Sequence, residues 1–303
     1  MSRPIEIVEV GPRDGLQNES VVLDVFERLE FIARLEAAGV RRIEAVSFVN
    51  PRRVPQMAGA EEIMGALCER VPGRSRIGLV LNARGWERAV ASGCDEANVV
   101  VCATDGFGIR NQGASVADQL ATLAAIATDR AERGGPRLTA TMSVAFGCPF
   151  DGEVSEAQVV AVAREIAAAG VEEIALADTI GVADPWTVRA RMAAVRAAAP
   201  DAKLRLHFHD TRNTGLANAA AALDAGADVL DASCGGIGGC PFAPGTTGNI
   251  ATEDLVYMLE RGGWNTGLDL DALIATAAWI GERLGRPRPS ALSRAGRFPP
   301  TAA

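Results

Sequence analysis

A repeated pattern of apolar and polar positions runs along most of this chain. An alanine-rich stretch with apolar residues at helical spacing ends at a glycine, and a short run of β-branched residues follows directly. The first example is the stretch 22–38, which ends at Gly39 before the apolar run 42–48. The pattern returns after three further glycines, Gly93, Gly170 and Gly226. Because glycine readily takes the left-handed C-cap conformation, each unit predicts a helix that leads straight into a strand.

Completing the pattern gives eight expected strands, each followed by a helical segment. They cover about residues 5–10, 42–48, 76–81, 97–103, 138–146, 172–178, 203–209 and 228–233. Eight β–α units at a spacing of roughly 30 residues predict a parallel sheet, and their number matches a (β/α)8 TIM barrel. An open doubly wound sheet is the alternative. Its nucleotide-binding fingerprint G-x-G-x-x-G is missing from the first turn, Gly11 to Gly15.

The chain reads as one domain, since no linker rich in Pro, Gly or Ser divides it. We expect a catalytic TIM barrel over residues 1–265. The segment 266–303 is expected to belong to the same domain, with an additional amphipathic helix at about 268–284 and a loose tail at the end. This places all candidate chemistry in the barrel.

Composition narrows the possible partners. Thirty-eight acidic residues against 30 basic ones give a net charge of −8, which argues against a nucleic-acid-binding protein. No apolar run is long enough to span a membrane, and no targeting signal is evident, so a cytoplasmic location is expected. The six cysteines are scattered and imply no disulfide framework. Histidine is scarce, with only two in the chain.

Both histidines, His207 and His209, fall at the end of the seventh expected strand. Positions i and i+2 of a strand face the same side, so the two imidazoles point in one direction. In a TIM barrel the carboxyl ends of the strands form the active-site face. The pair is therefore a candidate set of metal ligands, although an H-x-H pair can also be purely structural.

Asp14 is the natural carboxylate to complete such a site. It follows the first strand, and the first and eighth strands are neighbours in a closed barrel. Two imidazoles, one carboxylate and the amide of Asn249 make a mixed nitrogen and oxygen set. This set suits Mg²⁺ or Mn²⁺ in octahedral geometry, while Zn²⁺ or Co²⁺ also fits. An Asx turn at the strand end is the structural alternative for Asp14.

Several other polar residues interrupt the strands or follow them. The guanidinium of Arg13 could hold a carbonyl and stabilise an enolate oxygen, or form only a surface ion pair. Glu44 and Asp178 could position Arg13 or a water, or serve as buried polar plugs between barrel layers. The glycine run 235–239 predicts a mobile loop that delivers Cys240 as a proton donor or nucleophile. We also expect Arg13, Ser47 and Thr179 to contact a substrate.

These residues lie within strings that resemble 3-hydroxy-3-methylglutaryl-CoA lyases, a family of divalent-metal TIM-barrel lyases. The strings are VEVGPRDGLQNE from Val8, EAVSFVNP from Glu44, VPQM from Val54, FGCPF from Phe146, DTIG from Asp178, HFHDT from His207, and the segment from Gly235 through Asn249 with ATEDLVYML after it. The resemblance covers about residues 5 to 260. Claisen-type synthases share the Arg-Asp and H-x-H elements but are not expected to carry the cysteine loop.

The resemblance implies a role for each matching residue. Asp14, His207, His209 and Asn249 match the metal ligands, with Mg²⁺ or Mn²⁺ as the expected ion. Arg13 matches the arginine that steadies the enolate, Cys240 matches the catalytic cysteine, and Glu44 and Asp178 match supporting acids. The implied reaction cleaves 3-hydroxy-3-methylglutaryl-CoA to acetyl-CoA and acetoacetate, as in leucine degradation. The base is left open between Asp14 and a histidine.

Alternatives to this function remain at the level of the sequence. After HFHDT the chain continues RNTGLAN where many members have YGQALAN, so a related 3-hydroxy-3-substituted glutaryl-CoA is a second possible substrate. A Claisen-type acyltransferase and a non-catalytic barrel are further alternatives, and an iron oxygenase fits the H-x-H and carboxylate alone. The expected partners are an acyl-CoA substrate and, by resemblance, a second copy in a homodimer or higher homo-oligomer.

Overall fold

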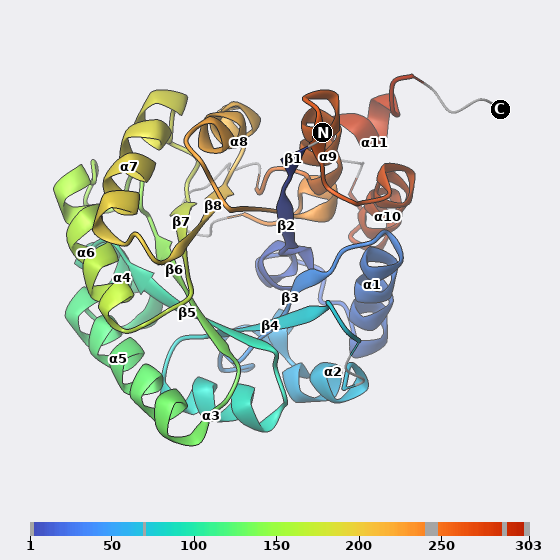
Figure 1. Cartoon of the computed structure of the whole chain (residues 1–303). Coiled ribbons are helices and arrows are strands. Elements are labelled where there is room, and N and C mark those ends of the chain that lie inside the picture. The colour runs from blue at the N-terminus through green and yellow to red at the C-terminus, as the bar shows by residue number, and fades with distance from the viewer. Residues whose placement is uncertain (1–2, 69–70, 240–247, 287–289, 300–303) are drawn as a thin grey trace.

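The computed structural model describes residues 3–68, 71–239, 248–286 and 290–299. Eight parallel strands form a closed barrel in chain order, and helices surround it (Figure 1). The strands are β2 (Glu6–Glu9), β3 (Arg42–Ser47), β4 (Ser75–Val80), β5 (Glu96–Cys102), β6 (Arg137–Ser143), β7 (Glu173–Asp178), β8 (Lys203–Phe208) and β9 (Val229–Ala232). The barrel closes between its first and last strands, where Ile7 lies opposite Leu230. The TIM barrel prediction is confirmed, and the open sheet is excluded.

Eleven α-helices accompany the strands in the part of the chain that the structure describes. They are α1 (Val25–Ala37), α2 (Ala60–Ala66), α3 (Ala83–Ala91), α4 (Asp105–Gln112), α5 (Val116–Arg133), α6 (Glu156–Ala168), α7 (Pro185–Ala198), α8 (Gly215–Asp224), α9 (Thr252–Arg261), α10 (Leu270–Arg283) and α11 (Ala291–Ala295). None of these described helices combines the length and apolar character that crossing a bilayer would require.

The expected start of the first helix at residue 22 is wrong by three residues. Asp24 caps α1: its carboxylate accepts a hydrogen bond from the Glu27 backbone N–H at 2.8 Å, and the Glu27 carboxylate accepts one from the Asp24 N–H at 3.2 Å. This reciprocal capping box satisfies two backbone donors that would otherwise lack partners, so the helix begins at Val25. Periodicity alone did not reveal the cap.

The expected helix is present in the C-terminal segment, and two further features near the ends of the chain were not expected. Helix α10 begins after its cap Asp269 and packs on α1, where the rings of Phe31 and Trp279 lie 6.1 Å apart. The short helix α11 is held to α9 by Asp254, whose carboxylate accepts hydrogen bonds from two backbone N–H groups at the start of α11. Strand β1 (Arg3–Pro4) pairs in parallel with β10 (Trp264–Asn265) outside the barrel. Elements this short carry no readable periodicity.

The barrel interior is filled at the amino-terminal ends of the strands. Arg42 opens β3, and its guanidinium binds Glu96 at 2.7 Å and Glu173 at 2.8 Å, each the first residue of its own strand. All three side chains are buried. A small apolar cluster, Val8, Val10, Ile77 and Val229, fills further interior space. Because these residues fill the amino-terminal end of the barrel, a site is expected at the opposite, carboxyl end.

Candidate metal centre and active site

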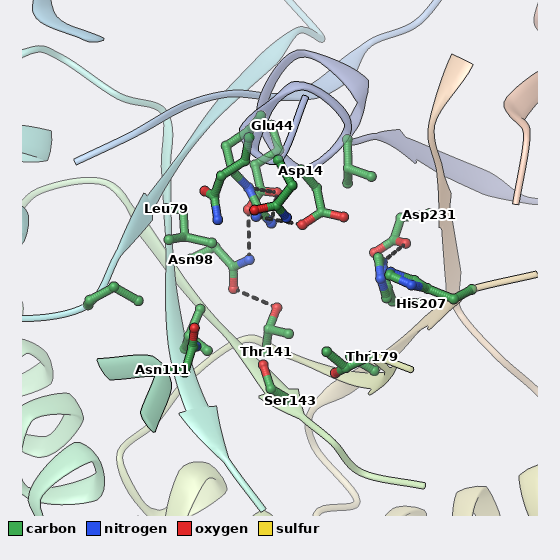
Figure 2. A pocket seen from close by; sticks show the side chains of 18 of the residues that line it. Asp14, Glu44, Leu79, Asn98, Asn111, Thr141, Ser143, Thr179, His207 and Asp231 are labelled. Carbon is green, nitrogen blue, oxygen red and sulfur yellow. Dashed lines mark hydrogen bonds and ion pairs between the residues drawn. The ribbon is translucent and has the colours of Figure 1, made fainter. Parts of the chain in front are cut away.

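A cavity lies at the carboxyl ends of the barrel strands, with polar side chains from many strands around it (Figure 2). The tight turn η1 (Gly11–Gly15) follows β2 and carries two of these side chains, Arg13 and Asp14, into the cavity. The turn needs glycine at both ends. A Cβ on Gly11 would lie 2.6 Å from the Glu9 carboxylate, and one on Gly15 would lie 2.7 Å from Ile237. The close approach of the backbone therefore fixes where the next residues point.

Arg13 bridges two carboxylates at the edge of the cavity. Its Nε donates to Glu44 Oε2 at 2.7 Å, and its Nη1 donates to Asp14 Oδ1 at 2.7 Å. Burial would lower the pKa of Arg13, but the two carboxylates outweigh it and raise the pKa. Burial would likewise raise the pKa of Asp14, but Arg13 and the two histidines hold it well below the ordinary value. Asp14 is thus a carboxylate, ready to act as a ligand.

The two histidines lie side by side, with ring centroids 5.0 Å apart, as their i, i+2 spacing predicts. Asp231 on β9 lies 2.7 Å from His207 Nδ1, so Nε2 is the atom left to bind a ligand. Burial lowers the pKa of His207, but Asp231 outweighs it and raises the pKa to about 8. Burial and the neighbouring His207 lower the pKa of His209 to about 3. His209 is therefore a neutral imidazole.

Asn249 completes the cluster from the segment that follows the glycine run. Its Nδ2 donates to Asp14 Oδ2 at 2.9 Å and to the Ile237 carbonyl at 3.0 Å. Among the described residues, its buried Oδ1 atom has no hydrogen-bond partner, and the same is true of Nδ1 of His209. Buried polar atoms without partners are rare because each carries a desolvation cost. Both are ordinary metal-ligand atoms.

These observations test whether a divalent cation fits. Three candidate ligand atoms lie within 4.8 Å of one another, one each from Asp14, His207 and His209. Asn249 contacts Asp14 through Nδ2, and its unpartnered amide oxygen is a candidate fourth donor. Two nitrogens and two oxygens suit Mg²⁺ or Mn²⁺, and an Asx turn does not account for the position of Asp14 against both imidazoles. The four residues fit a divalent cation.

Three further residues were expected from the sequence to support the site: Thr179, Asp178 and Ser47. Thr179 lines the cavity, and its hydroxyl accepts a hydrogen bond from the Val144 N–H at 2.8 Å. Asp178 is buried, accepts hydrogen bonds from the N–H groups of Val182 and Ala183, and so anchors the loop after β7. Ser47 is fully buried, and its hydroxyl has no hydrogen-bond partner in the part of the chain that the structure describes.

Cys240 lies outside the described residues. Gly239, the described residue before it, lines the cavity, and its carbonyl accepts a hydrogen bond from Asn18 Nδ2 at 2.6 Å. The proposed role of the cysteine therefore remains a prediction from the sequence.

Five polar residues that lie in barrel strands and line the cavity were missed by reading the sequence: Asn98, Thr141, Ser143, Arg205 and Asp231. Each lies inside an expected strand, so the apolar residues around it dominated the pattern. A usable signal was present, because inward-facing residues alternate along a barrel strand. Arg205 and His207 are two residues apart on β8, as are Thr139 and Thr141 on β6. Counting back two residues from His207 would have found Arg205.

Fold and cluster together define a TIM-barrel protein with a candidate divalent-metal site at the carboxyl end of the barrel. The HMGL-like family model matches residues 4–280, and the chain belongs to the HMGL-like family. The (R)-citramalyl-CoA lyase of Chloroflexus aurantiacus is 46% identical over 301 residues, covering 96% of this chain and 95% of that protein. The hydroxymethylglutaryl-CoA lyase of Bacillus subtilis is 40% identical and covers 95% of this chain and 96% of its own length.

Solved structures agree with the sequence relatives. The crystal structure of hydroxymethylglutaryl-CoA lyase from Pseudomonas aeruginosa matches with a TM-score of 0.92 at 39% identity, covering 97% of this chain and 98% of that one. The family resemblance is confirmed by these matches. Because relatives of high similarity act on two different thioesters by name, the family does not by itself fix the substrate.

Proposed function

We propose that this protein is a divalent-metal-dependent carbon–carbon lyase that cleaves 3-hydroxy-3-methylglutaryl-CoA into acetyl-CoA and acetoacetate. The observation that carries the proposal is the convergence of Asp14, His207 and His209 within 4.8 Å, beside the doubly anchored guanidinium of Arg13. The unpartnered oxygen of Asn249 supports it further. The expected ion is Mg²⁺ or Mn²⁺, and the named activity of the Bacillus and Pseudomonas relatives agrees with the substrate.

The reaction requires that the C3 hydroxyl lose its proton to a base, for which Asp14 and a histidine of the cluster are the candidates, that the C2–C3 bond break, and that C2 gain a proton. A divalent cation held by the four residues would supply Lewis acidity that lowers the pKa of the C3 hydroxyl. Arg13 would donate to the thioester oxygen, where negative charge develops as the bonding pair moves into the enolate. Glu44 holds this guanidinium in place. Cys240 is the proposed proton donor to C2, which completes acetyl-CoA.

A second candidate substrate for the same site is (R)-citramalyl-CoA. Its acyl chain has the same thioester, C2 methylene and C3 hydroxyl, but the carboxylate is joined directly to C3, so cleavage gives acetyl-CoA and pyruvate. The 46% identity to a citramalyl-CoA lyase is the observation that favours it. The chemistry assigned to Arg13 and the metal ligands is the same for both thioesters. The length of the carboxylate arm alone separates them.

One experiment tests both substrates. The purified protein is stripped of metal, resupplied with Mn²⁺ and assayed separately on the two thioesters, with acetoacetate and pyruvate measured as the distinguishing products. Acetoacetate release supports the first substrate and pyruvate release the second. Failure to cleave either one with metal present would overturn the lyase proposal. Consumption of acetyl-CoA only when an oxo acid is added would instead support an acyltransferase.

Two variants then locate the chemistry. His207→Ala is expected to abolish metal-dependent cleavage and to weaken Mn²⁺ binding, because it removes a ligand. Cys240→Ala is expected to keep Mn²⁺ binding and lose most of the cleavage rate. If Cys240→Ala cleaves at the wild-type rate, the cysteine takes no part in the reaction, whereas unchanged Mn²⁺ affinity in His207→Ala would refute the ligand assignment.

A further inference from the structure

A row of hydrogen bonds runs between neighbouring strands inside the barrel and reaches the carboxylate of Glu44. Thr141 on β6 donates its hydroxyl to Oδ1 of Asn98 on β5 at 3.0 Å, and Nδ2 of Asn98 donates to Oε1 of Glu44 on β3 at 3.0 Å (Figure 2). Asn98 and Glu44 are buried, and all three side chains line the cavity. We call this row the Thr141–Asn98 bridge.

The bridge has a fixed direction. Nη2 of Arg205 donates to the Thr141 hydroxyl oxygen at 3.3 Å, so the hydroxyl proton is directed to Asn98. Because the amide oxygen of Asn98 accepts that proton, its NH₂ group faces Glu44. The opposite amide orientation would place an oxygen against a carboxylate and leave the hydroxyl without an acceptor. Each donor therefore determines the orientation of the next side chain.

The bridge ends on the carboxylate that holds Arg13. Glu44 uses Oε1 for Asn98 and Oε2 for Arg13 Nε, at 2.7 Å. With both oxygens engaged, the plane of the carboxylate is fixed, and so is the direction in which the guanidinium reaches Asp14. We propose that Asn98 and Thr141 are positioning residues that orient Glu44 and thereby hold Arg13 where the thioester oxygen binds. The catalytic part of this inference rests on the proposed function.

The other end of the row reaches the histidine side of the site. Nε of Arg205 lies 3.5 Å from Oδ2 of Asp231, and Oδ1 of Asp231 lies 2.7 Å from His207. Polar contacts thus run from His207 through Arg205 and the bridge to Glu44 and Arg13, all within the cavity lining. A polar plug that only filled space would not need this order of donors and acceptors. The row connects the group expected to bind metal with the group expected to bind the thioester.

Thr141→Val and Thr141→Ser test the bridge as a matched pair. Valine keeps the shape of threonine and removes the hydroxyl, whereas serine keeps the hydroxyl and loses the methyl group. In Thr141→Val we expect kcat to fall about 10- to 100-fold, because even a small displacement of the Arg13 guanidinium disturbs the reacting geometry, with a much smaller change in KM. Thr141→Ser is expected to restore most of kcat. A variant affected only through packing would show the reverse order.

A second readout does not depend on activity. The Nε–H signal of Arg13 in the NMR spectrum of nitrogen-labelled protein, assigned by its absence in Arg13→Lys, reports the hydrogen bond to Glu44. We expect this signal to be sharp and protected from exchange in the wild type and in Thr141→Ser. In Thr141→Val it is expected to broaden or shift. An unchanged Arg13 signal together with unchanged kcat in Thr141→Val would overturn the proposal.

Thr139→Val is the matched control. Thr139 lies two residues earlier on the same strand, and its hydroxyl donates to Glu96 at 3.0 Å in the ion cluster at the amino-terminal end of the barrel. Thr139→Val also removes one threonine hydroxyl from β6 but leaves the bridge intact, so the Arg13 signal and kcat are expected to stay as in the wild type. If Thr141→Val does not fold, Asn98→Ala is measured in the same two ways. If the wild type cleaves no thioester, the proposed function fails, and the Arg13 signal still decides the bridge.

Discussion

Nδ1 of His207 lies 2.7 Å from Oδ1 of Asp231, a residue on the neighbouring strand β9. A metal-binding histidine commonly has its second ring nitrogen held by a carboxylate, which fixes the ring and increases its basicity. Both side chains are largely buried, at 12% and 4% exposure, so the contact is shielded from water. Asp231 therefore prepares Nε2 of His207 as a ligand.

Asp231→Asn is expected to weaken Mn²⁺ binding by about 10- to 100-fold, the usual cost of losing such a partner. The amide can still accept from the ring but carries no charge, so the imidazole becomes a poorer donor to the ion. Electron paramagnetic resonance of free Mn²⁺ measures the affinity. Asp228→Asn is the control, since Asp228 pairs with Arg196 at the surface and its variant should bind Mn²⁺ normally. Equal affinities of Asp231→Asn and wild type would contradict the assignment.

Binding of Mn²⁺ should depend on pH in a defined way. Without metal, the pKa of His207 is raised to about 8, whereas that of His209 is lowered to about 3 and Asp14 stays ionised. Near neutral pH one proton must therefore leave the cluster when the ion binds. We expect affinity to rise about tenfold per pH unit up to roughly pH 8 and to level off above it.

The Asp231→Asn variant sharpens this test. Since Asp231 is what raises the pKa of His207 against the effect of burial, its loss should move the break in the curve to lower pH. A titration of Mn²⁺ affinity in both proteins measures the shift. An affinity that does not change with pH in the wild type would show that His207 is not a ligand in competition with a proton.

The fold could be predicted from the sequence because most barrel strands carry a buried, largely apolar run between amphipathic helices. The expected strand 42–48 is observed as Arg42–Ser47, and 172–178 as Glu173–Asp178. The parallel pair β1 and β10 could not be predicted, since two residues give no periodicity and their partners are far apart in the chain. Patterns thus predict elements that are stabilised by burial, and miss those that depend on a distant partner.

The candidate site could be predicted only in part, for a related reason. His207 and His209 lie two residues apart, so local strand geometry was enough to place both rings together. The contact of Asp231 with His207 depends on the register between β8 and β9, where Leu206 lies opposite Leu230. Register is set by the closure of the whole barrel. A contact between strands therefore becomes visible only in three dimensions.

Arg13→Lys is expected to lower kcat by about 100-fold or more, comparable to the loss of one donor at a developing oxyanion. Lysine keeps the charge, but its single ammonium cannot hold Glu44 and Asp14 at once while donating to a thioester oxygen. Steady-state kinetics on the thioester that the wild type cleaves measure the effect, with Mn²⁺ affinity measured alongside. Arg189→Lys, at an exposed ion pair with Asp224, is the control and should retain wild-type kcat. Wild-type kcat in Arg13→Lys would show that the reaction does not need the several donors of the Arg13 guanidinium.

Glu9 is a fully buried carboxyl that joins the turn η1 to the segment after β9. Its Oε1 accepts from the N–H groups of Gly11 and Cys234, and its Oε2 is 2.7 Å from the Thr252 hydroxyl. Burial raises its pKa to about 8, so near neutral pH the folded protein holds a proton that the unfolded chain releases. Stability should therefore decrease as pH rises from about 5 to about 8, by at most about 1.4 kcal/mol per pH unit.

Glu9→Gln resembles the protonated form of this carboxyl at every pH. The amide oxygen can keep both backbone N–H groups, and the NH₂ group can donate to the Thr252 hydroxyl oxygen. We expect the melting temperature of Glu9→Gln to exceed that of the wild type at about pH 8 and to fall less steeply with pH. The buried carboxyl of Glu253, whose pKa burial raises to about 7, should account for part of the dependence that remains. Glu6→Gln is the control: it removes an exposed carboxylate from the same strand and should reproduce the wild-type slope of melting temperature against pH. If Glu9→Gln has the same slope as Glu6→Gln, Glu9 is ionised in the folded protein.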